Sequence, residues 1–182
     1  MAFLRRILAV AVALAALAPH ARAQSPEYKL KAAYLCRFVD FVDWPKSAFP
    51  STNSPLVIGV LGPDPFGGAL DEVAEGQKSN GHAIQIRRFS SPDEIKQCQV
   101  LFVSPSEAPK LAAIMRELQG RQMLTVSDLN NFTAHGGIIR FFTDNNKVRF
   151  RINLEAARAC QLTISSRLLQ LADVVKEGVG AP

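Results

Sequence analysis

The sequence has few of the residues and motifs that carry enzyme chemistry. The 182-residue chain holds three histidines, three cysteines and one tryptophan, and no Cys/His spacing matches a zinc site. It has neither the Gly-x-Ser-x-Gly elbow nor the Ser-x-x-Lys motif of serine hydrolases, and the Rossmann and Walker phosphate-binding fingerprints are also absent. We therefore expect no catalytic residues, no metal and no cofactor, and we expect that the protein is not an enzyme.

A hydrophobic run long enough to cross a membrane is missing too. The most apolar stretch, residues 7–18, has 12 residues, whereas a membrane-spanning helix needs about 20. Arg5 and Arg6 precede this stretch and Ala21-Arg22-Ala23 follow it, a pattern typical of a bacterial secretory signal peptide. An uncleaved anchor is the alternative. We expect cleavage after Ala23, which leaves one domain, residues 24–182, in the periplasm.

The chain also lacks a strong excess of one charge. The formal net charge of +5 includes Arg5, Arg6 and Arg22, and without them 18 basic side chains face 16 acidic ones, a net charge of +2. This near balance lacks the strong positive charge that is typical of a nucleic-acid-binding protein. No block of lysine and arginine indicates a patch that binds a membrane surface.

All three cysteines, Cys36, Cys98 and Cys160, follow the predicted cleavage site. In an oxidising compartment two of them can form a disulfide and leave the third free. Three free buried thiols are the alternative, because unpaired cysteine is common in protein cores. The pairing stays open at this stage.

Apolar patterning predicts alternating strands and helices. Residues 56–61 and 100–103 are apolar without alternation, as expected for strands buried on both faces of a parallel sheet. Residues 83–89 and 123–126 are predicted as two further strands. Apolar spacing and capping signals predict helices at residues 27–43, 65–74, from 106 or 108 to 119, 154–159 and 165–176, with a short one after Ser91.

The last strands are predicted to form an antiparallel hairpin. Residues 138–142 and 147–153 flank the turn Asp144-Asn145-Asn146, and Val148, Phe150 and Ile152 alternate with outward arginines. The whole order predicts an α/β fold, a three-layer sandwich. Its sheet is mostly parallel with the C-terminal antiparallel hairpin, and helices cover both faces.

One candidate ligand site lies where the predicted parallel strands end, since ligands bind in that crevice in open α/β sheets. The loop after the first strand contains Gly62, Asp64 and Phe66, and Ser127 and Asp128 follow the fourth strand. Asp64 as N-cap and Pro65 at the first helical position also explain this loop without any ligand. His82 and His135 are predicted as surface residues beside turns.

Two helices are candidates for a partner surface. The aromatic stripe Tyr34, Phe38, Phe41 and Trp44 is simplest as core, although aromatic residues are also enriched at interfaces. Leu30 and Val42 extend the same stripe. On the last helix, Leu168, Leu169 and Leu171 cannot all be buried on one narrow face, so they are candidates for a partner surface. A buried helix is the alternative.

Seven sequence blocks, taken in order, resemble the YfiR family. Each block alone is unspecific, but together they cover residues 28–174, nearly all of the predicted mature chain. The blocks are residues 31–45 followed by Phe49, and residues 58–67, 98–103, 124–128, 136–139, 148–158 and 162–172.

The resemblance implies a periplasmic α/β protein that is often a homodimer. Its best-known members bind the periplasmic domain of an inner-membrane diguanylate cyclase and hold the cyclase inactive, which lowers cyclic-di-GMP and restrains biofilm formation. An outer-membrane lipoprotein can sequester such a repressor, and other members occur beside sensor kinases. Relatives use disulfides; here Gly59 stands where a relative carries the partner of the Cys98 equivalent, and Cys160 has no second cysteine nearby. A periplasmic small-molecule binding module that uses the strand-end crevice is the alternative function.

Overall fold

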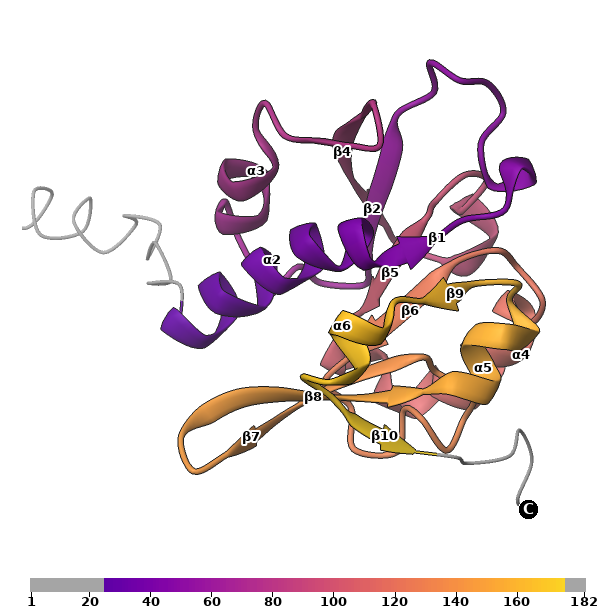
Figure 1. The fold of residues 1–182 in the computed structure, drawn as a ribbon. Coiled ribbons are helices and arrows are strands. Elements are labelled where there is room, and N and C mark those ends of the chain that lie inside the picture. Colours follow the sequence, from indigo (N-terminus) through magenta and orange to yellow (C-terminus); the bar gives the residue numbers. More distant parts are fainter. Residues whose placement is uncertain (1–24, 176–182) are drawn as a thin grey trace, which may run out of the picture.

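A mixed sheet of eight strands forms the centre of the molecule (Figure 1). The structure is a computed structural model that describes residues 25–175, so the predicted signal peptide, residues 1–23, lies outside the described residues. The strands follow the order β10-β8-β7-β6-β5-β2-β4-β3. Neighbours from β4 through β7 are parallel, and β7 with β8 forms the predicted antiparallel hairpin.

The strand bounds match the sequence predictions closely for the central strands. They are β2 (Leu56–Leu61), β4 (His82–Phe89), β5 (Val100–Val103), β6 (Leu124–Ser127), β7 (Ile139–Asp144) and β8 (Lys147–Asn153). Short strands β3 (Lys78–Ser79) and β10 (Asp173–Val175) lie at the edges of this sheet, and β1 (Val42–Asp43) pairs with β9 (Thr163–Ile164) in a separate ladder. The hairpin turn places Asn145 and Asn146 at φ 48° and 58°, which asparagine tolerates better than most residues.

Helices cover both faces of the sheet and complete three layers, as predicted. α2 (Pro26–Phe38), α3 (Ala69–Ala74), α5 (Leu154–Ala159) and α6 (Ser166–Leu169) lie on one face, and α4 (Leu111–Leu118) lies on the other (Figure 1). Successive side chains of a strand point to opposite faces of the sheet, so they pack into two different hydrophobic cores. In β2, Ile58 packs toward α2 and α3, whereas Val57 and Leu61 pack toward α4.

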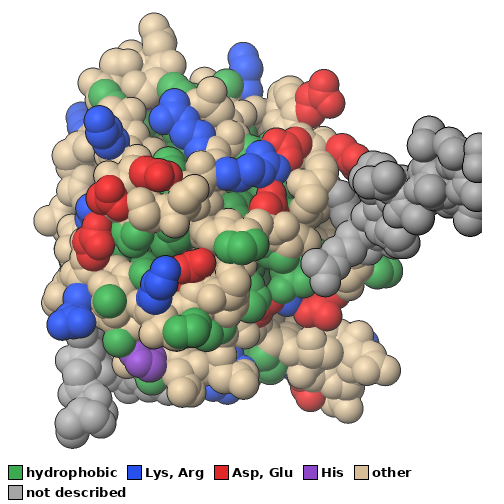
Figure 2. All heavy atoms as spheres, turned by 180° about the vertical axis from the view of Figure 1, so that it is seen from behind, with side chains coloured by type: hydrophobic (Ala, Val, Ile, Leu, Met, Phe, Trp, Pro, Cys, Tyr) green, Lys and Arg blue, Asp and Glu red, His purple; other side chains and the backbone are tan. Residues whose placement is uncertain are grey.

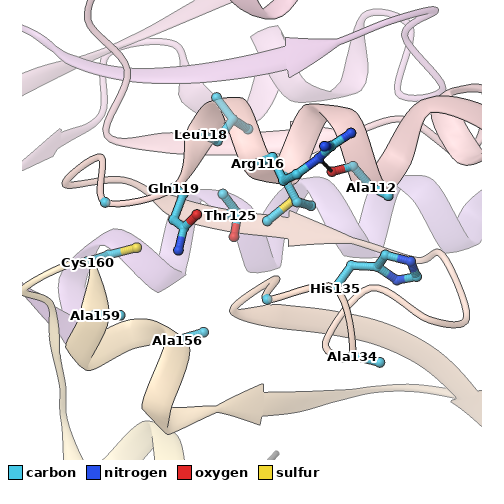
Figure 3. A pocket seen from close by; sticks show the side chains of 13 residues that line it. Ala112, Arg116, Leu118, Gln119, Thr125, Ala134, His135, Ala156, Ala159 and Cys160 are labelled. Carbon is cyan, nitrogen blue, oxygen red and sulfur yellow. Dashed lines mark hydrogen bonds between the residues drawn. The ribbon is translucent and has the colours of Figure 1, made fainter. Parts of the chain in front are cut away.

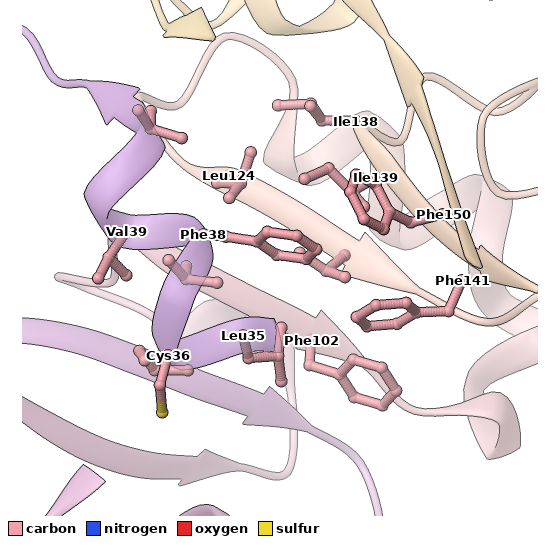
Figure 4. Close-up of a cluster of buried hydrophobic side chains, with 14 of the residues drawn as sticks. Leu35, Cys36, Phe38, Val39, Phe102, Leu124, Ile138, Ile139, Phe141 and Phe150 are labelled. Carbon is pink, nitrogen blue, oxygen red and sulfur yellow. The ribbon is translucent and has the colours of Figure 1, made fainter. Parts of the chain in front are cut away.

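The core under α2 is rich in aromatic rings. Phe38 stacks on Phe141 with ring centroids 5.7 Å apart and meets the edge of Phe150 at 5.1 Å (Figure 4). The buried face of α2 differs from the predicted stripe, because Leu30 is largely exposed while Ala32, Leu35 and Cys36 are buried. Tyr34, Phe41 and Trp44 are partly buried against the same core.

The first helix also ends earlier than predicted. α2 stops at Phe38, a 3₁₀ turn occupies Val39–Phe41, and the chain then forms β1 instead of continuing to residue 43. Hydrogen bonding explains the change, because the amide of Ser165 donates to the carbonyl of Phe41 and ties this segment to β9. Ser25 caps the other end by accepting a hydrogen bond from the amide of Glu27.

The second helix begins four residues later than the predicted start at Pro65. The Asp64 carboxylate accepts a hydrogen bond from the amide of Phe66 at 2.7 Å, but the chain turns at Gly67, whose φ is 57°. A left-handed residue cannot belong to a right-handed helix, so α3 starts at Ala69. The helix predicted from residue 106 or 108 likewise begins as a 3₁₀ segment, Pro105–Lys110, with Pro109 inside it. The short helix after Ser91 is a 3₁₀ turn, Pro92–Glu94.

The prediction of a helix over residues 165–176 is wrong in its second half. α6 ends at Leu169, and Asp173–Val175 form β10, which pairs in parallel with β8. Val174 and Val175 are β-branched and favour extended backbone. The hydrogen-bonding edge of β8 that β7 leaves free supplies a partner that helical spacing alone does not reveal.

Candidate functional site

The structure brings the predicted crevice residues together at the carboxyl ends of the parallel strands. Gly62 follows β2, and Ser127 and Asp128 lie at the end of β6. Hydroxyl groups link adjacent loops, because Ser104 donates to the carbonyl of Pro63 and Ser127 donates to that of Val103, both at 2.7 Å. Phe66 and Ser127 are completely buried, so these two side chains face the interior.

Helix α2 places two of its own side chains in this crevice. The Tyr28 ring meets the edge of Phe66 at 5.4 Å, and its hydroxyl donates to Asp128 Oδ2 at 2.8 Å. The Lys31 ammonium lies 2.7 Å from Asp128 Oδ2 and 2.7 Å from Glu27 Oε1. Lys31 is only 3% exposed, so these carboxylates replace water around its ammonium group. Burial and the neighbouring carboxylate of Asp128 raise the pKa of the Tyr28 phenol well above its ordinary value.

The Asp64 carboxylate is engaged on its other side by Arg88. Arg88 Nε lies 2.8 Å from Asp64 Oδ2, and its guanidinium also binds Asp71 of α3 and donates to the carbonyl of Gly67. The hydrogen bond from Arg88 holds the pKa of the Asp71 carboxyl below its usual value. This single arginine on β4 therefore fixes the loop between β2 and α3.

The candidate partner residues separate by exposure. Leu168 is the buried residue of α6, Leu169 of the same helix is half-buried, and Leu171 is 67% exposed. Val174 on the edge strand β10 is 43% exposed. Among the described residues near this end of the chain, Leu171 and Val174 are therefore the exposed large apolar side chains. Sequence patterning did not single out Val174.

The three cysteines are free thiols in the structure. Cys36 and Cys98 are buried, and burial raises the pKa of Cys36 to about 11 and that of Cys98 to about 12. Cys160 is half-buried, and its pKa is also raised by burial. A Cβ atom added at Gly59 would lie 2.8 Å from Cys98 Sγ, so the position named by the resemblance is adjacent to this thiol.

A largely apolar cavity of about 400 Å³ lies between α4, α5 and the loop before β7 (Figure 3). Met115 and Leu118 of α4, together with Ala156 and Cys160, form much of its wall, while Arg116 and His135 supply polar groups (Figure 3). Sequence reasoning missed this cavity, since its residues come from four separate segments.

Both described histidines contact backbone carbonyls. His135 is exposed, as predicted, and its Nδ1 lies 2.8 Å from the carbonyl oxygen of Asn131. His82 was predicted to be exposed, but it is half-buried. Its ring stacks on Phe49 with centroids 4.1 Å apart, and its Nδ1 lies 2.6 Å from the carbonyl oxygen of Ser54.

The reverse face of the molecule carries mixed charges (Figure 2). Basic and acidic side chains alternate there around hydrophobic ones, without a continuous field of one sign. Within residues 25–175 no group of three or more His, Cys, Asp or Glu side chains is arranged to hold a metal ion. No helix in that range has both the length and the apolar character needed to span a membrane.

These features define a three-layer α/β domain in which side chains of the chain's own helix α2 occupy the strand-end crevice. Residues 28–173 match the family model described as YfiR/HmsC-like, and the chain belongs to this family. A search of curated proteins finds no match. Among solved structures, the chain is similar to the ABC domain in complex with L-Trp from Streptococcus pneumonia, with a TM-score of 0.53 and 13% identity. The match covers 79% of this chain and 60% of that chain, and at this identity it shows the fold alone.

Proposed function

We propose that the protein is a periplasmic regulator that binds the periplasmic domain of an inner-membrane signalling receptor. The receptor class is a diguanylate cyclase, which the protein represses and whose cyclic-di-GMP output it lowers. The observation that carries this proposal is the family match, which spans residues 28–173. The proposal names a sensor kinase as the alternative receptor. It also includes an outer-membrane lipoprotein as a second partner and a homodimeric state.

The surface around Leu171 and Val174 is the contact that we assign to the receptor. β10 is an edge strand of the sheet, and an edge strand offers unpaired backbone groups to a partner. Leu171 stands beside it with 67% of its surface exposed. Complete burial of a leucine side chain contributes roughly 1.5–3 kcal/mol, so this residue alone can supply much of a regulatory binding energy.

Repression requires preferential binding to the inactive state of the receptor. To hold 99% of an evenly balanced receptor in the inactive state, the preference must reach about 2.7 kcal/mol. This energy is similar to the burial of one large apolar side chain. A compact contact centred on Leu171 is therefore sufficient, provided that only the inactive receptor presents the complementary surface.

A ligand-binding function at the strand-end crevice faces a structural obstacle. Tyr28 and Lys31 already satisfy most of the polar atoms there, although Asp128 Oδ1 is buried without a partner among the described residues. A ligand would have to displace these side chains and break the ion pair. The surface contact needs no such rearrangement, and we therefore rank it first.

The proposal is tested by site-specific photo-cross-linking in the cells of origin. A cross-linking residue at position 171 should capture an inner-membrane cyclase or kinase with a periplasmic domain, identified by mass spectrometry. The same residue at position 30 is the matched control, because Leu30 is also an exposed leucine but lies on α2. Capture of only a second copy of the chain, or equal capture from both positions, would refute the assigned surface.

A second measurement tests the direction of regulation. Leu171→Asp should weaken receptor binding by about 2 kcal/mol, roughly 30-fold, without unfolding the protein. Cellular cyclic-di-GMP should then rise toward the level of a strain without the protein, whereas Leu30→Asp should leave it unchanged. A fall in cyclic-di-GMP with Leu171→Asp would show activation instead of repression.

A further inference from the structure

A second cavity lies at the opposite end of the sheet from the strand-end crevice. It has a volume of about 270 Å³ and is bounded by the segment after β1, the start of β2 and the β3–β4 hairpin. Its walls include Trp44, Phe49, Ser79 and His82, with Asp43 and Lys46 also in the lining. The size is slightly below that of most sites for drug-sized ligands, so the cavity suits a small molecule.

Two buried polar atoms in this lining have no hydrogen-bond partner among the described residues. They are Trp44 Nε1 and Ser79 Oγ, and Ser79 is only 3% exposed. Buried polar groups are almost always paired, so an unpaired one needs a physical explanation, and a bound water, ion or ligand can supply it. The indole nitrogen can only donate, and the hydroxyl group can donate as well. Each group can therefore be satisfied by an acceptor oxygen atom.

Two further residues of the lining, Phe49 and His82, are aromatic, and their rings hold a defined orientation. His82 Nδ1 faces the carbonyl oxygen of Ser54 at 2.6 Å, and since a carbonyl only accepts, the proton lies on Nδ1. The ring stacks nearly parallel on Phe49, with an angle of 12° between the planes. A flat apolar group can pack against such rings.

The charged residues of the lining are an exposed lysine and an exposed aspartate, Lys46 and Asp43. The ammonium of Lys46 can approach an anionic group, whereas Asp43 opposes one. The two charges nearly cancel, so selectivity has to come from the buried donors. A carboxylate matches those donors well, because each of its two oxygens can accept a hydrogen bond.

We propose that this cavity binds the carboxylate of a small organic acid, with Trp44 Nε1 and Ser79 Oγ as the hydrogen-bond donors and the aromatic walls against the organic group. This site is separate from the strand-end crevice and does not depend on the identity of any receptor. It therefore goes beyond the regulatory function proposed above, and either can fail without the other.

Trp44 makes a direct test available, because it is the only tryptophan in the chain. The ¹⁵N-labelled protein gives a single indole N–H signal, and sodium benzoate is the probe. We expect benzoate to move this signal saturably in the millimolar range typical of weak ligands, roughly 1–10 mM. Sodium chloride at equal ionic strength tests for an effect of salt, and benzyl alcohol tests for binding through the ring alone.

The variant Ser79→Ala removes one donor and keeps the Trp44 signal. Its affinity for benzoate should fall by about fivefold, the usual effect of one lost hydrogen bond. Ser90→Ala is the matched control, since Ser90 is an exposed serine just beyond the other end of β4. The proposal is overturned if the signal stays fixed, if chloride or benzyl alcohol moves it as benzoate does, or if Ser79→Ala binds benzoate as tightly as the unaltered protein.

Discussion

The buried ion pair between Lys31 and Asp128 should contribute strongly to stability, and a double-mutant cycle measures how much. Lys31 Nζ is 2.7 Å from Asp128 Oδ2, and the two side chains are 4% and 12% exposed. Removal of one member of a buried pair leaves an uncompensated charge and typically costs about 3–5 kcal/mol. Glu27 also contacts Lys31 but is much more exposed, so it compensates only in part.

We expect Lys31→Met to lower the free energy of unfolding by about 3 kcal/mol, because the Asp128 carboxylate then keeps only the Tyr28 hydroxyl as partner. Asp128→Asn should lower it by about 2 kcal/mol, since Lys31 retains Glu27. The double variant contains no buried charge and should lose about 2–3 kcal/mol in total. The coupling energy is therefore about 2–3 kcal/mol.

Urea unfolding followed by Trp44 fluorescence gives all four free energies, and melting temperatures provide an independent measure. For a domain of this size, 1 kcal/mol corresponds to about 2–4 °C, so Lys31→Met should lower the melting temperature by about 6–12 °C. Lys29→Met is the control, because Lys29 is exposed on the same helix, and it should change stability by less than about 0.5 kcal/mol. Additive single effects, or losses below about 1 kcal/mol, would mean that the pair behaves like a solvated surface pair.

Three further predictions concern proton binding and thiols. Because burial raises the pKa of Tyr28, the folded protein holds the phenol proton more tightly than the unfolded chain, whose phenol titrates near pH 10. The free energy of unfolding should therefore fall as the pH rises above about 10. Tyr28→Phe should flatten that fall in unfolding curves measured at a series of pH values. Gly59→Cys should form a disulfide with Cys98 on oxidation, detected as the loss of two titratable thiols, since the new Cβ lies 2.8 Å from Cys98 Sγ. If the thiols at positions 59 and 98 both persist, the geometry is contradicted. Gly59→Ala presses the same Cβ against Phe89 and should lower the free energy of unfolding by about 1–3 kcal/mol. In the native protein Cys160 should react first with a thiol reagent monitored by mass spectrometry, because Cys98 is buried and its pKa is raised to about 12; equal rates would indicate that the interior opens.

Local sequence was sufficient to predict where the central strands lie along the chain. Residues 56–61 and 100–103 are apolar throughout, and a segment that is buried on both faces has no polar side to alternate. The hairpin was predictable because Asn145 and Asn146 accept positive φ. In each case the decisive signal lies within a few consecutive residues.

The elements that were mispredicted depend on contacts from distant parts of the chain. β10 forms because β8 offers a free edge, although Leu168 and Leu171 have helical spacing. The Asp64 carboxylate binds Arg88, 24 residues away, and does not cap α3, because the chain turns at Gly67 between Asp64 and the helix. Gly67 was the one local signal that could have shifted the helix start, since glycine readily adopts positive φ.

In the candidate site, too, the contacts that local sequence could not predict join residues from distant parts of the chain. The crevice residues were predicted to gather at the strand ends, and they do, but the sequence gives no sign that Lys31 of α2 joins them. Lys31 and Asp128 are 97 positions apart, and a lysine on an amphipathic helix is normally solvated. His82 was misjudged for a similar reason, since its neighbours Phe49 and Ser54 come from another segment.

The two places where this fold could bind a small molecule can be distinguished by the behaviour of Tyr28. A ligand in the strand-end crevice must break the hydrogen bond from Tyr28 to Asp128, so it would remove one of the causes, besides burial, that raise the pKa of the phenol. A ligand beside Trp44 would leave that pKa unchanged and move only the indole signal. Open α/β sheets usually offer this crevice to ligands, but side chains of α2 fill it here. We therefore expect a small-molecule ligand to bind in the Trp44 cavity. An alkaline titration of Tyr28 with and without benzoate shows which of the two sites benzoate occupies.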